Sequence, residues 1–121
     1  EPLSIQTAIK VSSFFGASIH ATLRRLVEFS PARCALLVMK EPKPTNATLR
    51  DLFHSQSFLS DIGSIHFDES LDYLRYSFVE SYVRREKSAQ GKFLASVNES
   101  SIELRYEYFF NGYNGFVLIY P

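Results

Sequence analysis

The sequence has little of what several classes of protein require. Cys34 is its one cysteine, so no disulfide can form within the chain. It has no apolar run of about 18 residues and no signal-like leader, which argues against a membrane span and a secreted scaffold. We therefore expect a cytoplasmic location.

A surplus of charge of one sign is also missing. The chain carries 13 basic and 13 acidic residues, and its formal net charge at pH 7 is zero. Proteins that bind nucleic acid usually carry a surplus of Lys and Arg, because those residues neutralise phosphates. The composition predicts no general affinity for nucleic acid, although it leaves a local basic patch open.

Motifs of catalytic and cofactor chemistry are absent as well. His20, His54 and His66 have no second His or Cys at the spacing of a zinc site, and no His-Glu-x-x-His occurs. The five glycines are scattered, so the chain has no glycine-rich phosphate loop. Cys34 lies in an apolar run, where a thiol is usually buried and unreactive. We expect no metal, cofactor or catalytic residue in this chain.

The chain does contain the material of a folded core. Its 121 residues fit one domain, and 45% of them are hydrophobic and 15% aromatic. The sequence begins at Glu1 rather than Met, which suggests a fragment or processed product of a longer protein.

Two short helices are predicted at the N-terminus. Ser4 is a candidate cap for the first helix and Gly16 for its end, while Ser18 is a candidate cap for a second helix at Ile19–Phe29. Pro31 stops the second helix. The three-residue connection is typical of a helix-turn-helix, and equally of any helical hairpin packed on a larger domain.

The second predicted helix carries candidate contact residues. Ser18, His20, Arg24 and Arg25 are placed to touch DNA or a partner protein if this helix is a recognition helix. The alternative is an ordinary solvated helix face, because basic pairs are common on exposed helices.

The rest of the chain predicts a small antiparallel sheet. The apolar run at residues 34–39 indicates a buried strand over residues 33–40. Strict alternation from Ile102 to Tyr108, followed by Asn-Gly pairs and a second apolar run, predicts a hairpin over residues 101–120, with residues 93–97 as its neighbour. We expect a strand or a short helix in residues 45–61, and His66 at an outward position of a short strand.

One long helix is predicted to pack on this sheet. Leu71, Leu74, Phe78 and Tyr82 recur at spacings of three and four, which favours a helix from Asp68 or Ser70 to about Lys87. The prediction is thus an α+β fold, with a helical hairpin in residues 1–30 and a sheet with one long helix in residues 31–121.

Aromatic residues gather in the predicted hairpin. Cys34, Tyr106, Tyr108 and Phe116 are candidates to line a small-molecule pocket. The alternative is that they belong to the hydrophobic core, as alternating aromatic residues in a hairpin commonly do.

Residues 15–29, residues 30–38 and residues 107–119 are three stretches that together resemble the ImmA/IrrE family of metallopeptidases. Residues 15–29 and residues 30–38 resemble the region that follows the catalytic domain in that family, and residues 107–119 are similar to its closing strand. The likeness spans most of the chain but is loose in residues 42–97. The matching positions are architectural: the turn at Gly16 and Ser18, Arg24 and Arg25 on the helix, and the Cys34 strand.

This resemblance implies a specific role. Such proteins have a zinc peptidase domain with His-Glu-x-x-His, a helix-turn-helix-like segment and, in some members, a GAF-like sensor domain. They cleave a helix-turn-helix repressor and so release stress or mobile-element genes. Because the chain has no His-Glu-x-x-His, zinc and catalysis are expected only in a separate peptidase domain.

We therefore expect a non-catalytic regulatory part of such a peptidase, with a GAF/PAS-like sensor domain in residues 31–121. Its expected partners are the peptidase domain of the same protein and the repressor that this domain cleaves. The alternative is a stand-alone small-molecule-binding or protein-interaction domain unrelated to proteases. A small enzyme with a site assembled by the fold is a third hypothesis, which no residue pattern recommends.

Overall fold

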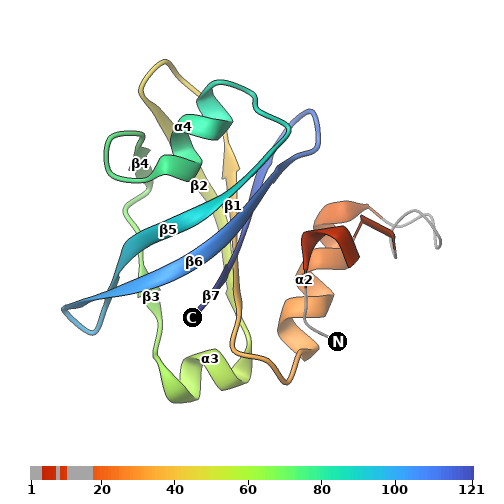
Figure 1. Cartoon of the computed structure of the whole chain (residues 1–121), viewed down its shortest axis with the longest axis vertical. Coiled ribbons are helices and arrows are strands. Elements are labelled where there is room, and N and C mark those ends of the chain that lie inside the picture. The colour runs from red at the N-terminus through yellow and green to blue at the C-terminus, as the bar shows by residue number, and fades with distance from the viewer. Residues whose placement is uncertain (1–3, 8, 11–17) are drawn as a thin grey trace.

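The computed structural model describes residues 4–7, 9–10 and 18–121 (Figure 1). Residues 5–7 and 9–10 are helical, and the Ser4 hydroxyl accepts the Thr7 amide at 3.1 Å, as expected for a cap. The predicted turn at Gly16 lies outside the described residues. Helix α2 (Ile19–Phe29) begins where the sequence predicts, because Ser18 Oγ accepts the Ala21 amide at 3.1 Å.

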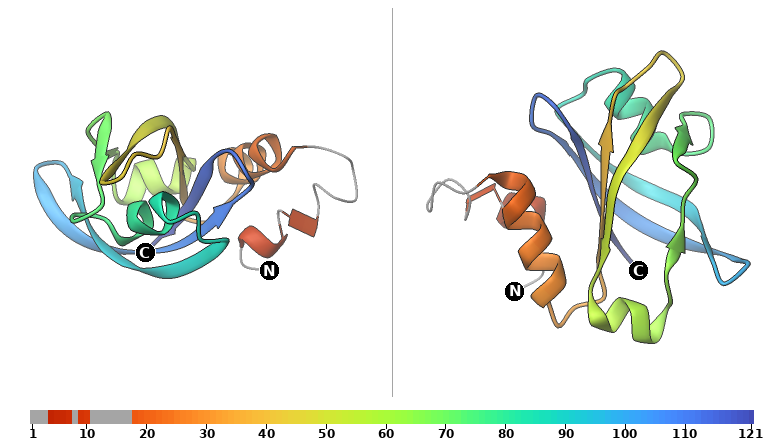
Figure 2. Two further views of the ribbon diagram at one scale, coloured as in Figure 1. Left: turned by 90° about the horizontal axis from the view of Figure 1, so that it is seen from above. Right: turned by 180° about the vertical axis from the view of Figure 1, so that it is seen from behind.

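A single antiparallel sheet forms the body of the described chain. Its strands are β1 (Ala35–Lys40), β2 (Asn46–His54), β3 (Ile65–His66), β4 (Ser70–Asp72), β5 (Ser88–Val97), β6 (Ser100–Phe110) and β7 (Gly115–Tyr120). They lie in the order β3-β5-β6-β7-β1-β2-β4. Only residues 67–69 separate the two edge strands β3 and β4, so one short segment joins both edges and the sheet is strongly curled (Figure 2).

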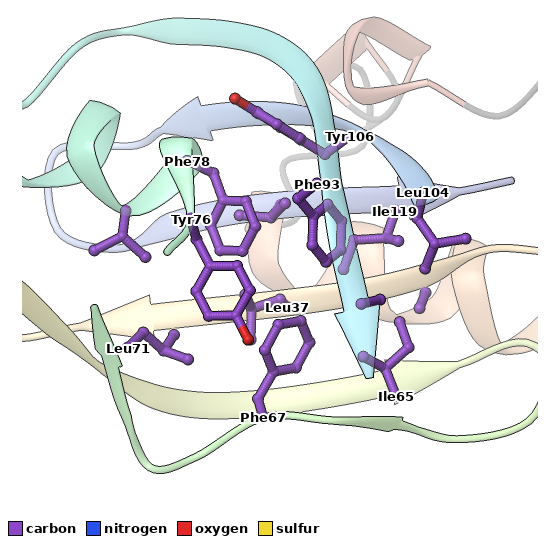
Figure 3. Close-up of a cluster of buried hydrophobic side chains, with 14 of the residues drawn as sticks. Leu37, Ile65, Phe67, Leu71, Tyr76, Phe78, Phe93, Leu104, Tyr106 and Ile119 are labelled. Carbon is purple, nitrogen blue, oxygen red and sulfur yellow. The ribbon is translucent and has the colours of Figure 1, made fainter. Parts of the chain in front are cut away.

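The sheet is buried on both faces at its centre. Side chains on the inside of the curl form an inner cluster, part of which is drawn in Figure 3. Side chains on the outside, with residues of α2, form an outer cluster. In β1, Leu37 and Met39 belong to the inner cluster and Leu36 and Val38 to the outer one. This two-sided burial explains why β1 is a continuous apolar run.

Two short helices close the ends of the curl (Figure 1). Helix α3 (Gln56–Asp61) lies at one end and contributes Phe58 to the inner cluster. Helix α4 (Ser77–Val83) lies at the other end and contributes Phe78, Val79 and Tyr82. Gly115 in β7 lies directly beneath Tyr82, since a Cβ there would come within 2.9 Å of its ring.

The prediction of a long helix over residues 68–87 is wrong. Residues 70–72 form β4, where Leu71 pairs with Ala47 of β2. The Asp72 carboxylate then accepts the Leu74 amide at 2.9 Å, which closes a turn before α4 begins. Helix α4 ends at Val83 with Arg84 as its C-cap, and Arg85 follows with a φ of 55°, so the helix covers only one end of the sheet.

The predictions of strands from the sequence are confirmed. The strand in residues 33–40, the hairpin in residues 101–120 and the pairing of residues 93–97 with it are all present. Residues 45–61 contain a strand and a short helix, and His66 is exposed on a short strand. The fold is α+β with a curled antiparallel sheet. None of the described helices is long and apolar enough to cross a lipid bilayer.

Candidate functional site

Helix α2 has one buried face and one exposed face. Leu23 and Val27 are fully buried against the outer face of β1 and β7. Arg24, Arg25 and Glu28 face solvent. This separation is that of an amphipathic helix anchored on a sheet, and it leaves a polar helix face free.

His20 lies at the border of the two faces. Its ring centroid is 5.7 Å from that of Phe116 and 6.5 Å from that of Phe53, and its Nε2 is 3.5 Å from an Asp51 carboxylate oxygen. Burial lowers the pKa of His20, the Arg50 guanidinium lowers it further, and Asp51 opposes both. The lowered pKa favours the neutral imidazole, whose ring packs against Phe116 and Phe53.

A bulge in β2 brings Arg50 and Asp51 to this place. Val38 of β1 pairs with Asp51, whereas the next residue, Met39, pairs with Leu49, so Arg50 is the extra residue. The Arg50 guanidinium donates to the Asn114 side-chain oxygen at 2.8 Å. The bulge therefore holds a positive charge close to His20.

Two cation–aromatic pairs occupy the exposed side of α2. The Arg24 guanidinium lies 4.7 Å from the centre of the Phe53 ring, and its Nε donates to Glu28 at 3.1 Å. The Arg25 guanidinium lies 5.9 Å from the ring centre of Phe29. Phe29 is 79% exposed, so its ring is open to contact from outside the chain.

A shallow hollow of about 550 Å³ runs along this exposed side. The described residues that line it are Ser18, His20, Ala21, Arg24, Arg25, Glu28 and Phe29. All four contact residues expected from the sequence thus border one hollow. With guanidinium, carboxylate and aromatic groups, it suits recognition of another surface.

Sequence reasoning missed several residues of this site. Glu28 follows Arg24 by four positions, a spacing that signals a helical ion pair. Asp51 and Phe53 gave no signal, because their proximity to α2 depends on the pairing of β1 with β2.

The four candidate pocket residues do not come together. Cys34 and Phe116 belong to the outer cluster, whereas Tyr106 and Tyr108 belong to the inner one, on the other face of the sheet. The Tyr106 hydroxyl lies 2.7 Å from Ser77 Oγ. Burial raises the pKa of the Cys34 thiol, in agreement with an unreactive core position.

Among the described residues, no three His, Cys, Asp or Glu side chains gather as metal ligands. Comparison with protein-family models found no match to this chain. Comparisons with curated proteins and with solved structures found no significant match either.

Proposed function

We propose that this chain is the non-catalytic regulatory part of a cytoplasmic ImmA/IrrE-type zinc metallopeptidase that cleaves a transcriptional repressor. In this proposal the exposed side of α2 docks on the peptidase domain of the same protein. The observation that carries it is the exposed Phe29, stacked under Arg25 at the rim of the α2 hollow. Residues 18–29, which carry much of the family resemblance, form this helix and its cap.

The charged and aromatic side chains on and beside α2 favour a protein partner over DNA. Arg24 is already paired with Glu28, and Asp51 adds a second carboxylate beside the helix. A helix that reads DNA presents its basic groups to phosphates and bases, and nearby carboxylates oppose this. Exposed aromatic and Arg side chains, in contrast, are enriched where proteins bind one another.

The order of the long strands supports a GAF/PAS-like sensor domain in residues 31–121. The long strands lie in the order β5-β6-β7-β1-β2. Strands β1 and β7, the first and the last along the chain, are therefore neighbours at the centre of the sheet. Helices α3 and α4, which follow β2, close the ends of the curl, and α2 covers the outer face (Figure 1). This is the arrangement we expect of such a sensor domain.

The proposal is tested by binding. The reading frame that encodes this chain is expected to encode a His-Glu-x-x-His peptidase domain, and that domain, purified, is titrated with this chain. Phe29→Ser is expected to weaken binding by about tenfold or more, as loss of an interface aromatic does. Leu94→Ser is the matched control, because Leu94 is 63% exposed on β5, away from α2.

Three outcomes would overturn the proposal. One is a reading frame without the His-Glu-x-x-His motif. Another is unchanged binding by Phe29→Ser in a chain whose unfolding is also unchanged. The third is zinc-dependent proteolysis by the 121-residue chain on its own.

A further inference from the structure

Strand β5 is paired unequally on its two sides. On one side it pairs with β6 along its whole length, from Ser88 to Val97. On the other side β3 pairs only with Val97 and Ser96. Within the described chain, no strand and no backbone hydrogen bond occupies that second side along residues 88–95.

This edge has hydrogen-bonding capacity to offer. In an antiparallel strand, alternate residues direct their N–H and C=O groups to the same side. Along residues 88–95 every second residue therefore directs its N–H and C=O groups away from β6, to a side without a partner strand. Such an edge is a template for an added strand, as in recognition by β-augmentation.

A hollow of about 460 Å³ lies beside the edge. Lys92 and Phe93 of β5 form one wall, and the turn at residues 73–75 forms the other. The Phe93 ring is held in place by two neighbouring rings, because its centroid is 5.2 Å from that of Phe78 and 5.9 Å from that of Tyr76 (Figure 3). Leu74, in the turn, is 81% exposed and offers an apolar contact.

The charges of this hollow are mainly basic. Arg75 and Lys92 line it, together with Glu80, and the Lys92 ammonium also lies 3.8 Å from the exposed Glu103 carboxylate of β6. The Glu80 carboxylate is already paired with Arg84 at 3.3 Å. The Arg75 guanidinium lies 5.1 Å from the Tyr76 ring centre, and within the described chain it has no carboxylate partner. An incoming carboxylate would find Arg75 free to pair.

We propose that the free edge of β5 binds an extended segment of a partner protein, in which acidic residues alternate with apolar ones, as an additional strand. Backbone hydrogen bonds to β5 hold the segment, carboxylates meet Arg75 and Lys92, and an apolar side chain lies against Leu74. In the sheet β6 lies between β5 and β7, whereas α2 packs on β1 and β7, and the two hollows share no lining residue, so this site is distinct from the docking face proposed above.

A second copy of the chain is a poorer occupant. Strand β5 contains no acidic residue, so β5 paired with its own copy would bring no carboxylate to Lys92. A Lys in the middle of an edge strand also discourages pairing between copies. The same Lys attracts an acidic strand, which makes the edge selective.

Amide hydrogen exchange with two synthetic probes tests the proposal. Both peptides are extended and contain alternating valines, separated by glutamates in one and by lysines in the other. The glutamate peptide is expected to slow exchange of alternate β5 amides in residues 88–95 by about tenfold or more and to shift the NMR signals of Leu74 and Arg75. The lysine peptide is expected to do neither.

A charge reversal gives an independent check. Arg75→Glu is expected to weaken binding of the glutamate peptide by roughly fivefold or more. Arg33→Glu is the matched control, because Arg33 is also exposed but lies outside the hollow, and it is expected to leave binding unchanged.

Several results would overturn the proposal. If neither peptide changes exchange in β5, the edge is not a binding site. If both peptides bind equally, its preference for acidic segments is wrong. If the β5 amides become protected as the free chain is concentrated, a second copy occupies the edge. These results concern β5 alone and differ from a failure of Phe29→Ser to affect docking.

Discussion

The imidazole of His54 accepts a hydrogen bond from the backbone amide of Ile65, with 3.1 Å between Nε2 and the amide nitrogen. This bond links the end of β2 to β3, the short edge strand that pairs with β5. The His54 ring also packs against Phe58, at 5.5 Å between centroids. Only an unprotonated Nε2 can accept the amide, so the link requires a neutral imidazole.

Acid is expected to destabilise the fold through His54. Burial lowers the pKa of His54 from its ordinary value of 6.5. The unfolded chain therefore takes up the proton first, and the stabilisation present above that value is lost as the pH falls through it toward the folded-state pKa. His20, whose pKa is also lowered, contributes in the same direction. Urea unfolding between about pH 7.5 and 5.5 measures the loss.

Two variants test whether His54 causes this loss of stability in acid. His54→Gln keeps an acceptor but cannot titrate, so we expect a smaller loss of unfolding free energy over the same pH range. His66→Gln is the matched control, because the His66 side chain is 73% exposed, and it is expected to keep the wild-type loss. An undiminished loss in His54→Gln would contradict the role given to this imidazole.

Two buried tyrosine hydroxyls differ in their partners, and their removal is expected to have different effects. The Tyr82 hydroxyl donates to the Tyr113 carbonyl at 2.8 Å. The Tyr108 hydroxyl is buried and, within the described chain, has no hydrogen-bond partner. Tyr82→Phe should cost about 1 kcal/mol, whereas Tyr108→Phe should be neutral or stabilising by up to about 1 kcal/mol, because it removes an unpaired buried group. Urea unfolding decides, and a loss in Tyr108→Phe as large as in Tyr82→Phe would refute the distinction.

The strands could be predicted because their patterns are local. Strand β6 alternates apolar and charged residues since one face is buried, and β1 is apolar throughout since both faces are buried. Strand β2 was ambiguous for a physical reason. Its bulge at Arg50 spaces the inward Leu49 and Leu52 three residues apart, which breaks the period of two.

The prediction of a long helix was wrong because the apolar pattern on which it rested comes from three elements: β4, a turn and α4. Leu71 points into the inner cluster from β4, while Phe78 and Tyr82 reach it from α4. Leu74, which completes the helical spacing, is exposed in the turn between them. Burial thus follows tertiary contacts, which a local pattern does not contain.

The candidate sites show the same division. Ser18, His20, Arg24 and Arg25 could be placed together because they share one helix. The candidate pocket residues could not be placed in this way, because the face of the sheet to which each side chain points depends on the register of its strand. Tyr106 and Tyr108 point inward, while Phe116 pairs with Phe109 and points outward, and the turn at residues 111–114 sets that register.

Ser55 is expected to be the most sensitive serine in the described chain. Its buried hydroxyl accepts the amides of Cys34 at 3.1 Å and Phe58 at 3.2 Å, and donates to the Ala32 carbonyl at 2.7 Å. Ser55→Ala should lower the free energy of unfolding by on the order of 2 kcal/mol, since it removes a helix cap and leaves the buried Cys34 amide without a hydrogen-bond acceptor. Ser18→Ala, which removes an exposed cap, should cost about 1 kcal/mol or less. Equal losses in urea unfolding would disprove the importance of burial at Ser55.

The two faces of β6 provide a final test of the sheet. Leu104 is buried in the inner cluster, whereas the neighbouring Glu103 is exposed and lies 3.8 Å from Lys92. Leu104→Ala should cost on the order of 2 to 5 kcal/mol, because it leaves a cavity among packed side chains. Glu103→Ala should cost well under about 1 kcal/mol, since an exposed ion pair contributes little. Urea unfolding of both variants measures the contrast, and similar losses on the two faces would contradict the inward orientation of Leu104.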